Sequence, residues 1–142
     1  MTASPGKPKH QSRFVSFTII GEKLDPEKIS AALKLAPSRA FRAGEKKGTG
    51  DDEWDHGLWS VSTESVIEAE DLAEHIAWLL DRLEPSATEL GEVLSGDDIR
   101  ARIFCFFETE RLNDGIKLSA GIIKRLAALD LRVDIDIYNS SL

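Results

Sequence analysis

Residues 99–108, Ile-Arg-Ala-Arg-Ile-Phe-Cys-Phe-Phe-Glu, are rich in branched and aromatic side chains. All five residues from 103 to 107 are apolar, and successive side chains of an extended chain point to opposite faces. Such a strand is therefore apolar on both faces, which is typical of a strand inside a sheet. The sequence predicts a central β-strand here, and the rest of the chain must supply its neighbours.

Four other stretches predict strands around this one. Residues 15–19 alternate apolar with polar, the pattern of a strand with one face on a core. Two further strands are expected at 39–43 and 58–63, joined by the polar, glycine-rich segment 44–57, whose composition favours a mobile hairpin tip over packed backbone. The last strand is predicted to turn apolar side chains inward (Leu131, Val133, Ile135 and Ile137) and polar ones outward (Arg132, Asp134, Asp136 and Tyr138).

Three main helices are predicted to cover the sheet. Asp25 can cap a helix that begins at Pro26 and ends at Pro37. A second helix, which Pro85 is expected to end, carries the clearest apolar stripe, made of Leu72, Ile76, Leu79, Leu80 and Leu83. Ser119 can cap the third helix. Between the second and third main helices, a capping box formed by Ser86 and Glu89 predicts a short helix.

These elements predict an α+β domain of two layers: a largely antiparallel sheet of about five strands, with the helices packed on one face. Residues 17–35 and 106–129 both run strand, polar loop, capped helix, which favours a duplicated, ferredoxin-like plan. Residues 1–12 contain no periodic apolar positions and are expected to form a disordered leader. The single domain is then expected to span 13–142.

Composition and charge exclude several functional classes. The chain has 142 residues, 42% hydrophobic and 30% charged, as in one soluble globular domain. Eighteen Lys and Arg against twenty-five Asp and Glu give a net charge of -7, which disfavours nucleic acid and favours a protein partner, a basic one in particular. Without an export signal or an apolar stretch of membrane-spanning length, the chain is expected to be cytoplasmic, with no membrane partner.

The motifs of catalysis, metal binding and cofactor binding are missing from the sequence. The acidic cluster at 51–56 lacks the ligand order of a calcium loop, and the three histidines lack the paired spacing of a zinc site. The glycine-rich segment 44–50 lacks the closing Lys-Ser/Thr of a phosphate loop, and no serine-nucleophile motif occurs. The single cysteine, Cys105, is expected in the core. Neither a metal nor a cofactor is predicted, and an enzyme is disfavoured.

The last strand carries the best candidate for chemistry. Asp134 and Asp136 project from one side of it, roughly 7 Å apart by strand geometry, with Tyr138 next in that row. The two carboxylates could divide acid and base roles if burial separated their pKa values, with Arg42 completing a polar row. The favoured alternative is that they form cross-strand ion pairs with Arg39 or Arg42 on a solvated face. Both interpretations stay open at this level.

Six short stretches, in order, resemble the bacterial family named domain of unknown function 4279. They are 17–21 (Phe-Thr-Ile-Ile-Gly), 24–26 (Leu-Asp-Pro), 35–45 (Leu-Ala-Pro-Ser-Arg-Ala-Phe-Arg-Ala-Gly-Glu), 59–62 (Trp-Ser-Val-Ser), 79–85 (Leu-Leu-Asp-Arg-Leu-Glu-Pro) and 134–138 (Asp-Ile-Asp-Ile-Tyr). The chain departs from the family pattern at Phe41, where tryptophan is commoner, and in the extended tip 44–57. The resemblance implies a small cytoplasmic bacterial domain and brings no activity with it.

The leading hypothesis is a non-enzymatic binding or protein-interaction domain, for example an immunity protein that neutralises a toxin. The alternative is a small enzyme or ligand-binding domain around Asp134, Asp136 and Tyr138. A third hypothesis is a homodimer that pairs exposed sheet edges or faces. Trp78, off the apolar stripe of its helix, either anchors a partner or covers a neighbouring element. The candidate binding residues are Arg42, Glu45, Asp134, Asp136, Tyr138 and Trp78.

Overall fold

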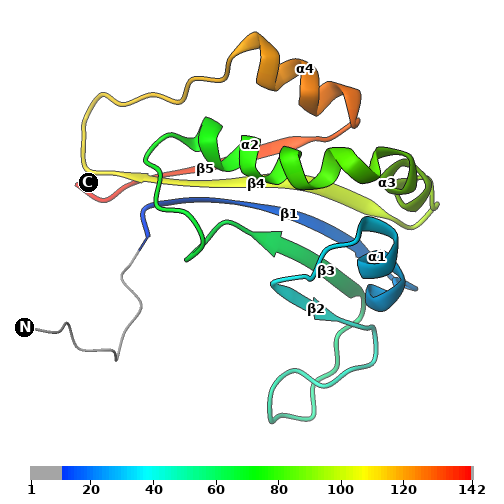
Figure 1. The fold of residues 1–142 in the computed structure, drawn as a ribbon. Helices are drawn as coiled ribbons and strands as arrows, with labels where there is room; N and C mark the ends of the chain where they lie inside the picture. The colour runs from blue at the N-terminus through cyan, green and yellow to red at the C-terminus, as the bar shows by residue number, and fades with distance from the viewer. Residues whose placement is uncertain (1–10, 142) are drawn as a thin grey trace, which may run out of the picture.

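The computed structural model describes residues 11–141 and holds a five-stranded sheet with its helices on one face (Figure 1). In chain order the elements are β1 (Arg13–Gly21), α1 (Pro26–Leu33), β2 (Arg39–Phe41), β3 (Gly57–Ser62), α2 (Leu72–Leu83), a 3-10 turn (Glu84–Ser86), α3 (Ala87–Leu94), β4 (Arg100–Thr109), α4 (Ala120–Ala128) and β5 (Val133–Asn139). The α+β class and the mostly antiparallel sheet are confirmed. No helix within 11–141 is long and apolar enough to cross a membrane.

The strand order is β2-β3-β1-β4-β5. β1 pairs antiparallel with both β3 and β4, and β2 pairs antiparallel with β3. β5 runs parallel to β4, because a crossover containing α4 returns the chain to the same end of the sheet. β4 thus has a neighbour on each side, as its two apolar faces predict. The ferredoxin-like duplication stays a prediction.

The core lies between the sheet and the helices. Alternate residues of β1 (Val15, Phe17 and Ile19), together with Trp59 and Ile103 on the flanking strands, are fully buried under the helical layer. The predicted stripe of α2 faces the same core, with all five of its residues buried. Among the described residues no helix lies over the opposite face of the sheet, which we call the open face (Figure 1). Phe14 and Phe106 stack there at 5.1 Å between ring centroids.

The helix ends differ in part from the prediction. α1 ends at Leu33 and not at Pro37, because Lys34 takes a left-handed conformation (φ 55°) and donates its N–H to the carbonyl of Ser30. α2 ends at Leu83, two residues before Pro85, as predicted, and a 3-10 turn that contains Pro85 leads directly into α3.

The two predicted serine caps have different outcomes. Ser86 makes no side-chain cap, because its hydroxyl donates to the carbonyl of Leu33 at 3.3 Å, so the capping box is wrong. Ser119 does cap α4, accepting from the N–H of Ile122 at 3.2 Å. The Ser86 hydroxyl is engaged in a contact with a distant residue, Leu33, whereas the Ser119 hydroxyl is available to cap its own helix.

The segment 44–57 is a paired hairpin rather than unpacked backbone. The Gly44 N–H donates to the Trp54 carbonyl at 2.8 Å, and the Trp54 N–H returns a bond to Glu45 at 2.9 Å. The Trp54 ring stacks on Phe41 with 3.8 Å between centroids, which holds the hairpin against β2. Composition alone indicated a mobile hairpin tip, because it does not show this backbone pairing or the stacking of Trp54 on Phe41.

Residues 1–10 of the predicted leader 1–12 lie outside the described residues. Gln11 is bonded on both sides: its amide donates to the Ile67 carbonyl at 2.8 Å and accepts from the Ser65 N–H at 2.8 Å. The carbonyl of Ser12 accepts from the Glu108 N–H at 2.8 Å. Gln11 and Ser12, which the predicted leader includes, are therefore both hydrogen bonded to the rest of the domain.

Candidate binding surface

β5 forms one edge of the sheet, and within residues 11–141 no strand pairs with its outer side. The Arg132 carbonyl accepts from Ile103, and the Ser140 N–H donates to Thr109, so the even-numbered residues bond to β4. In a parallel ladder the alternate residues then direct their N–H and C=O groups away from β4. The outward backbone groups belong to Val133, Ile135, Ile137 and Asn139.

The apolar row of β5 is not the core row that its alternation predicts. Ile135 lies beside Cys105 and Ile137 beside Phe107, so both face the helical side of the sheet. Yet Ile135 is 38% exposed and Ile137 is 64% exposed. Leu131, which precedes β5, is buried, but the strand then runs out beyond α4 (Figure 1).

The polar row of β5 faces the open side, as predicted. The Asp134 carboxylate accepts from Arg132 Nε at 2.9 Å and from Arg102 Nη1 at 3.0 Å. These two hydrogen bonds lower the pKa of Asp134, with the charges of both guanidinium groups adding to the effect. The Tyr138 ring, half exposed, lies 5.2 Å from the ring of Phe106.

Arg42 does not join this row, and the predicted pairing of Arg39 or Arg42 with the β5 carboxylates is wrong. β2 and β5 are the two opposite edges of the sheet, with three strands between them. Arg42 instead bonds the carboxylates of Asp25 at 2.7 Å and Glu27 at 2.6 Å, at the start of α1. Strand order separates residues whose charges suggested a pair.

Arg102 is the partner of Asp134 that sequence reasoning missed. It sits on β4 two residues before Phe104, and therefore on the same open face by strand alternation. That alternation was readable from the sequence, but only the pairing of β4 with β5 brings Arg102 beside Asp134.

The other two candidate binding residues lie elsewhere. Glu45 belongs to the hairpin, where its carbonyl accepts from Trp54. Trp78 is half-buried against the core, and the Arg82 guanidinium lies 3.5 Å above its ring. The structure therefore brings Asp134, Asp136 and Tyr138 together on β5 and places Arg42, Glu45 and Trp78 apart from them.

Asp134 is poorly placed to act as a general acid. A general acid among paired carboxylates needs a raised pKa. The pKa of Asp134 moves the other way, because two arginines stabilise its ionised form. Within residues 11–141 no group of three or more potential ligands is placed to hold a metal ion. What β5 offers is apolar and polar contact along a free backbone edge.

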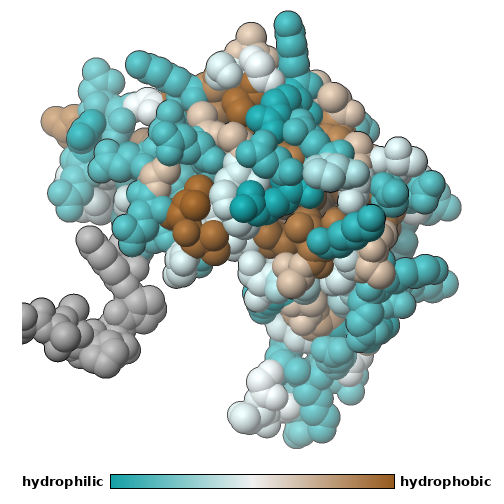
Figure 2. All heavy atoms as spheres, viewed as in Figure 1, coloured by the Kyte–Doolittle hydropathy of each residue, from teal (hydrophilic) through white to brown (hydrophobic). Residues whose placement is uncertain are grey.

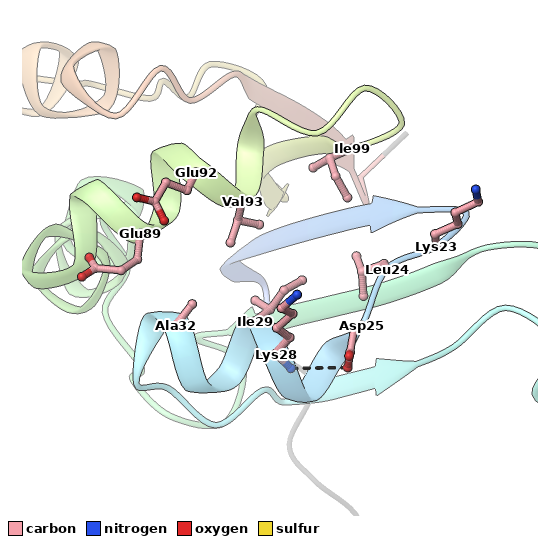
Figure 3. A pocket seen from close by; sticks show the side chains of 10 residues that line it. All are labelled: Lys23, Leu24, Asp25, Lys28, Ile29, Ala32, Glu89, Glu92, Val93 and Ile99. Carbon is pink, nitrogen blue, oxygen red and sulfur yellow. Dashed lines mark hydrogen bonds between the residues drawn. The ribbon is translucent and has the colours of Figure 1, made fainter.

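A separate groove of about 620 Å³ lies between α1 and α3 (Figure 3). Its apolar lining is Leu24, Ile29, Ala32, Val93 and Ile99, with Lys23 and Lys28 on one side and Glu89 and Glu92 on the other. Sequence reasoning missed this groove, because its two walls come from helices more than 50 residues apart in the chain. On the side of the molecule seen in Figure 2, hydrophobic atoms surface only in small areas among hydrophilic ones.

Cys105 is an expected core residue that the structure confirms as fully buried. Burial, with a smaller effect from the charge of Asp134, raises the pKa of its thiol to about 12. The thiolate is the reactive form, so at pH 8 the native protein should react with Ellman's reagent about 10³-fold more slowly than an unperturbed thiol. Unfolding in urea should restore the ordinary rate. Rapid reaction of the native chain would contradict the buried placement.

Comparison with known protein families gives a match over almost the whole chain. A family model described as "Domain of unknown function (DUF4279)" matches residues 10–140. No curated protein and no solved structure matches the chain.

Proposed function

This chain belongs to the DUF4279 family, and from that premise we propose that it is a non-enzymatic protein-interaction domain that binds a partner strand along the free edge of β5. The family description carries no activity, so the proposal depends on the surface of the molecule. Strand addition to an open sheet edge is a common mode of protein recognition, in which backbone hydrogen bonds give affinity and alternate side chains give specificity.

The distribution of exposed hydrophobic side chains carries this proposal. Six large hydrophobic residues are exposed within 11–141, and three of them lie on β5: Ile135, Ile137 and Tyr138. An edge strand with apolar side chains is a template for pairing unless something covers it. β5 has seven residues, or about 23 Å at about 3.3 Å per residue, which is long enough for a stable added strand.

An immunity protein that neutralises a bacterial toxin in the cytoplasm is the concrete form of this proposal. A small domain with a net charge of -7 can attract a basic partner and block it by binding alone. The alternative, an enzyme or ligand-binding domain around Asp134, Asp136 and Tyr138, has less support. Arg42 lies at the opposite edge of the sheet, and Asp134 is held ionised by two arginines.

Replacing Ile137 by lysine should remove partner binding without unfolding the domain. The side chain is largely exposed, so we expect a change in folding stability of no more than about 0.5 kcal/mol. The tagged chain is incubated with lysate of its source cell, and captured proteins are quantified by mass spectrometry. The captured amount of a true partner should be at least about tenfold lower with Ile137→Lys than with the wild type, since a cation replaces a central apolar contact.

Val66→Lys is the matched control, because Val66 is a β-branched residue of similar exposure that lies outside every strand. It should capture the same partner as the wild type. In the complex, hydrogen exchange at the amides of Ile135 and Ile137 should slow, because those N–H groups become bonded. A partner that binds Ile137→Lys and the wild type equally would overturn the assignment to β5.

A further inference from the structure

Given strand addition at β5, on which this inference rests, we infer that the partner strand alternates apolar with basic residues, and that its basic side chains lie on the open side opposite Asp136. The two sides of β5 differ, so they constrain the two sides of whatever pairs with it. A partner residue directly opposite a β5 residue projects to the same face of the extended sheet.

The helical side of β5 favours apolar side chains on the partner strand. Ile135 and Ile137 are two positions apart, face the helices and are exposed. A strand that places apolar side chains opposite them would remove this surface from water on one side of the new pair. Every second residue of the partner strand is therefore expected to be apolar.

The open side of β5 favours a cationic side chain on the partner strand. Asp134 already has two arginines, whereas Asp136 is exposed and forms no ion pair within residues 11–141. A lysine or arginine opposite Asp136 would come within the 4.5–5.5 Å Cβ spacing of a cross-strand pair. Its side chain could also reach diagonally to the exposed Tyr138 ring, where a cation is attracted to the aromatic face.

The same charges disfavour a second copy of this chain as the partner. Antiparallel pairing of two β5 strands over all seven residues places Asp136 directly opposite Asp136 of the other copy, and like charges so placed are destabilising. Moving the register by one pair shortens the ladder to five residues. Asp136 thus acts against self-association at an edge that would otherwise pair with itself.

The test uses two synthetic peptides as probes. One has the sequence of residues 132–139, and the other has the same sequence with lysine at both aspartate positions. Each is titrated into isotopically labelled protein, and binding is read from the amide NMR shifts of Ile135 and Ile137. We expect the basic peptide to bind the wild type at least about tenfold more tightly than the acidic one. In Asp136→Lys protein the order should reverse.

Asp51→Lys is the matched control, since it changes net charge equally but lies in the hairpin next to the opposite edge. It should keep the preference for the basic peptide. If both peptides shift the β5 amides with equal affinity, or if the order survives Asp136→Lys, the charge preference is overturned while strand addition stands. If neither peptide shifts those amides, strand addition at β5 is itself overturned.

Discussion

Replacing Trp59 by alanine is expected to lower the free energy of unfolding by about 3–5 kcal/mol, because it removes the largest side chain of the core. Trp59 is fully buried on β3, with its ring edge-on to Phe17 at 6.3 Å between centroids. Its Nε1–H donates to the Ser30 hydroxyl of α1 at 3.0 Å. The substitution therefore opens a cavity between sheet and helix and leaves Ser30 without that donor. Urea unfolding followed by circular dichroism measures the loss.

Trp78→Ala serves as the matched control. The Trp78 side chain is only half-buried, so its removal should cost about 1–2 kcal/mol. Similar losses for the two variants would show that Trp59 is not a central core residue in solution. Because neither residue belongs to β5, folded protein from both variants should still bind the peptide probes.

Replacing Thr63 by valine should cost about 2–4 kcal/mol although it changes the side-chain volume little. Thr63 is fully buried after β3, where its hydroxyl accepts from the Val15 N–H at 2.9 Å and lies 2.6 Å from Nδ1 of His75. The other ring nitrogen, Nε2, lies 2.7 Å from the Ala69 carbonyl and donates its proton to it, so both ring nitrogens have a hydrogen-bond partner. Valine leaves the Val15 N–H and Nδ1 of His75 without this hydrogen-bond partner, and each unbonded buried group costs about 1–3 kcal/mol of folding stability.

Thr63→Ser separates hydrogen bonding from packing. Serine keeps the hydroxyl and loses one methyl group, which should cost about 1 kcal/mol. The two variants are compared by urea unfolding, with hydrogen exchange at the Val15 amide as a local probe. A valine variant as stable as the serine variant would show that the hydroxyl network contributes nothing to folding.

The periodic elements were predictable from sequence because their signals are local. The apolar run at 103–107 identified β4 as a central strand, and the stripe from Leu72 to Leu83 identified α2 almost to the residue. Both patterns arise from backbone geometry, which repeats every two residues in a strand and every 3.6 in a helix. Burial of Cys105 follows from the same pattern.

The candidate surface was predictable only in part. Alternation correctly placed Asp134, Asp136 and Tyr138 on one side of the last strand. It also placed Ile135 and Ile137 in the core, which is wrong, because a strand pattern does not show whether a helix extends over both ends of the strand. Arg102, and not the predicted Arg39 or Arg42, pairs with Asp134, because strand order decides which charged side chains become neighbours.

By itself the sequence determined which segments are strands and helices, which residues of the central strands and α2 face the core, and that the chain is acidic, since each of these depends on residues close together in the chain. Only the tertiary structure decided that β5 is an edge, that its isoleucines are exposed, and that α1 and α3 enclose a groove. Those features depend on which distant segments come to lie side by side, and that arrangement is determined by the packing of the whole core. The proposed binding edge is therefore built from a locally encoded strand whose exposure the rest of the fold decides.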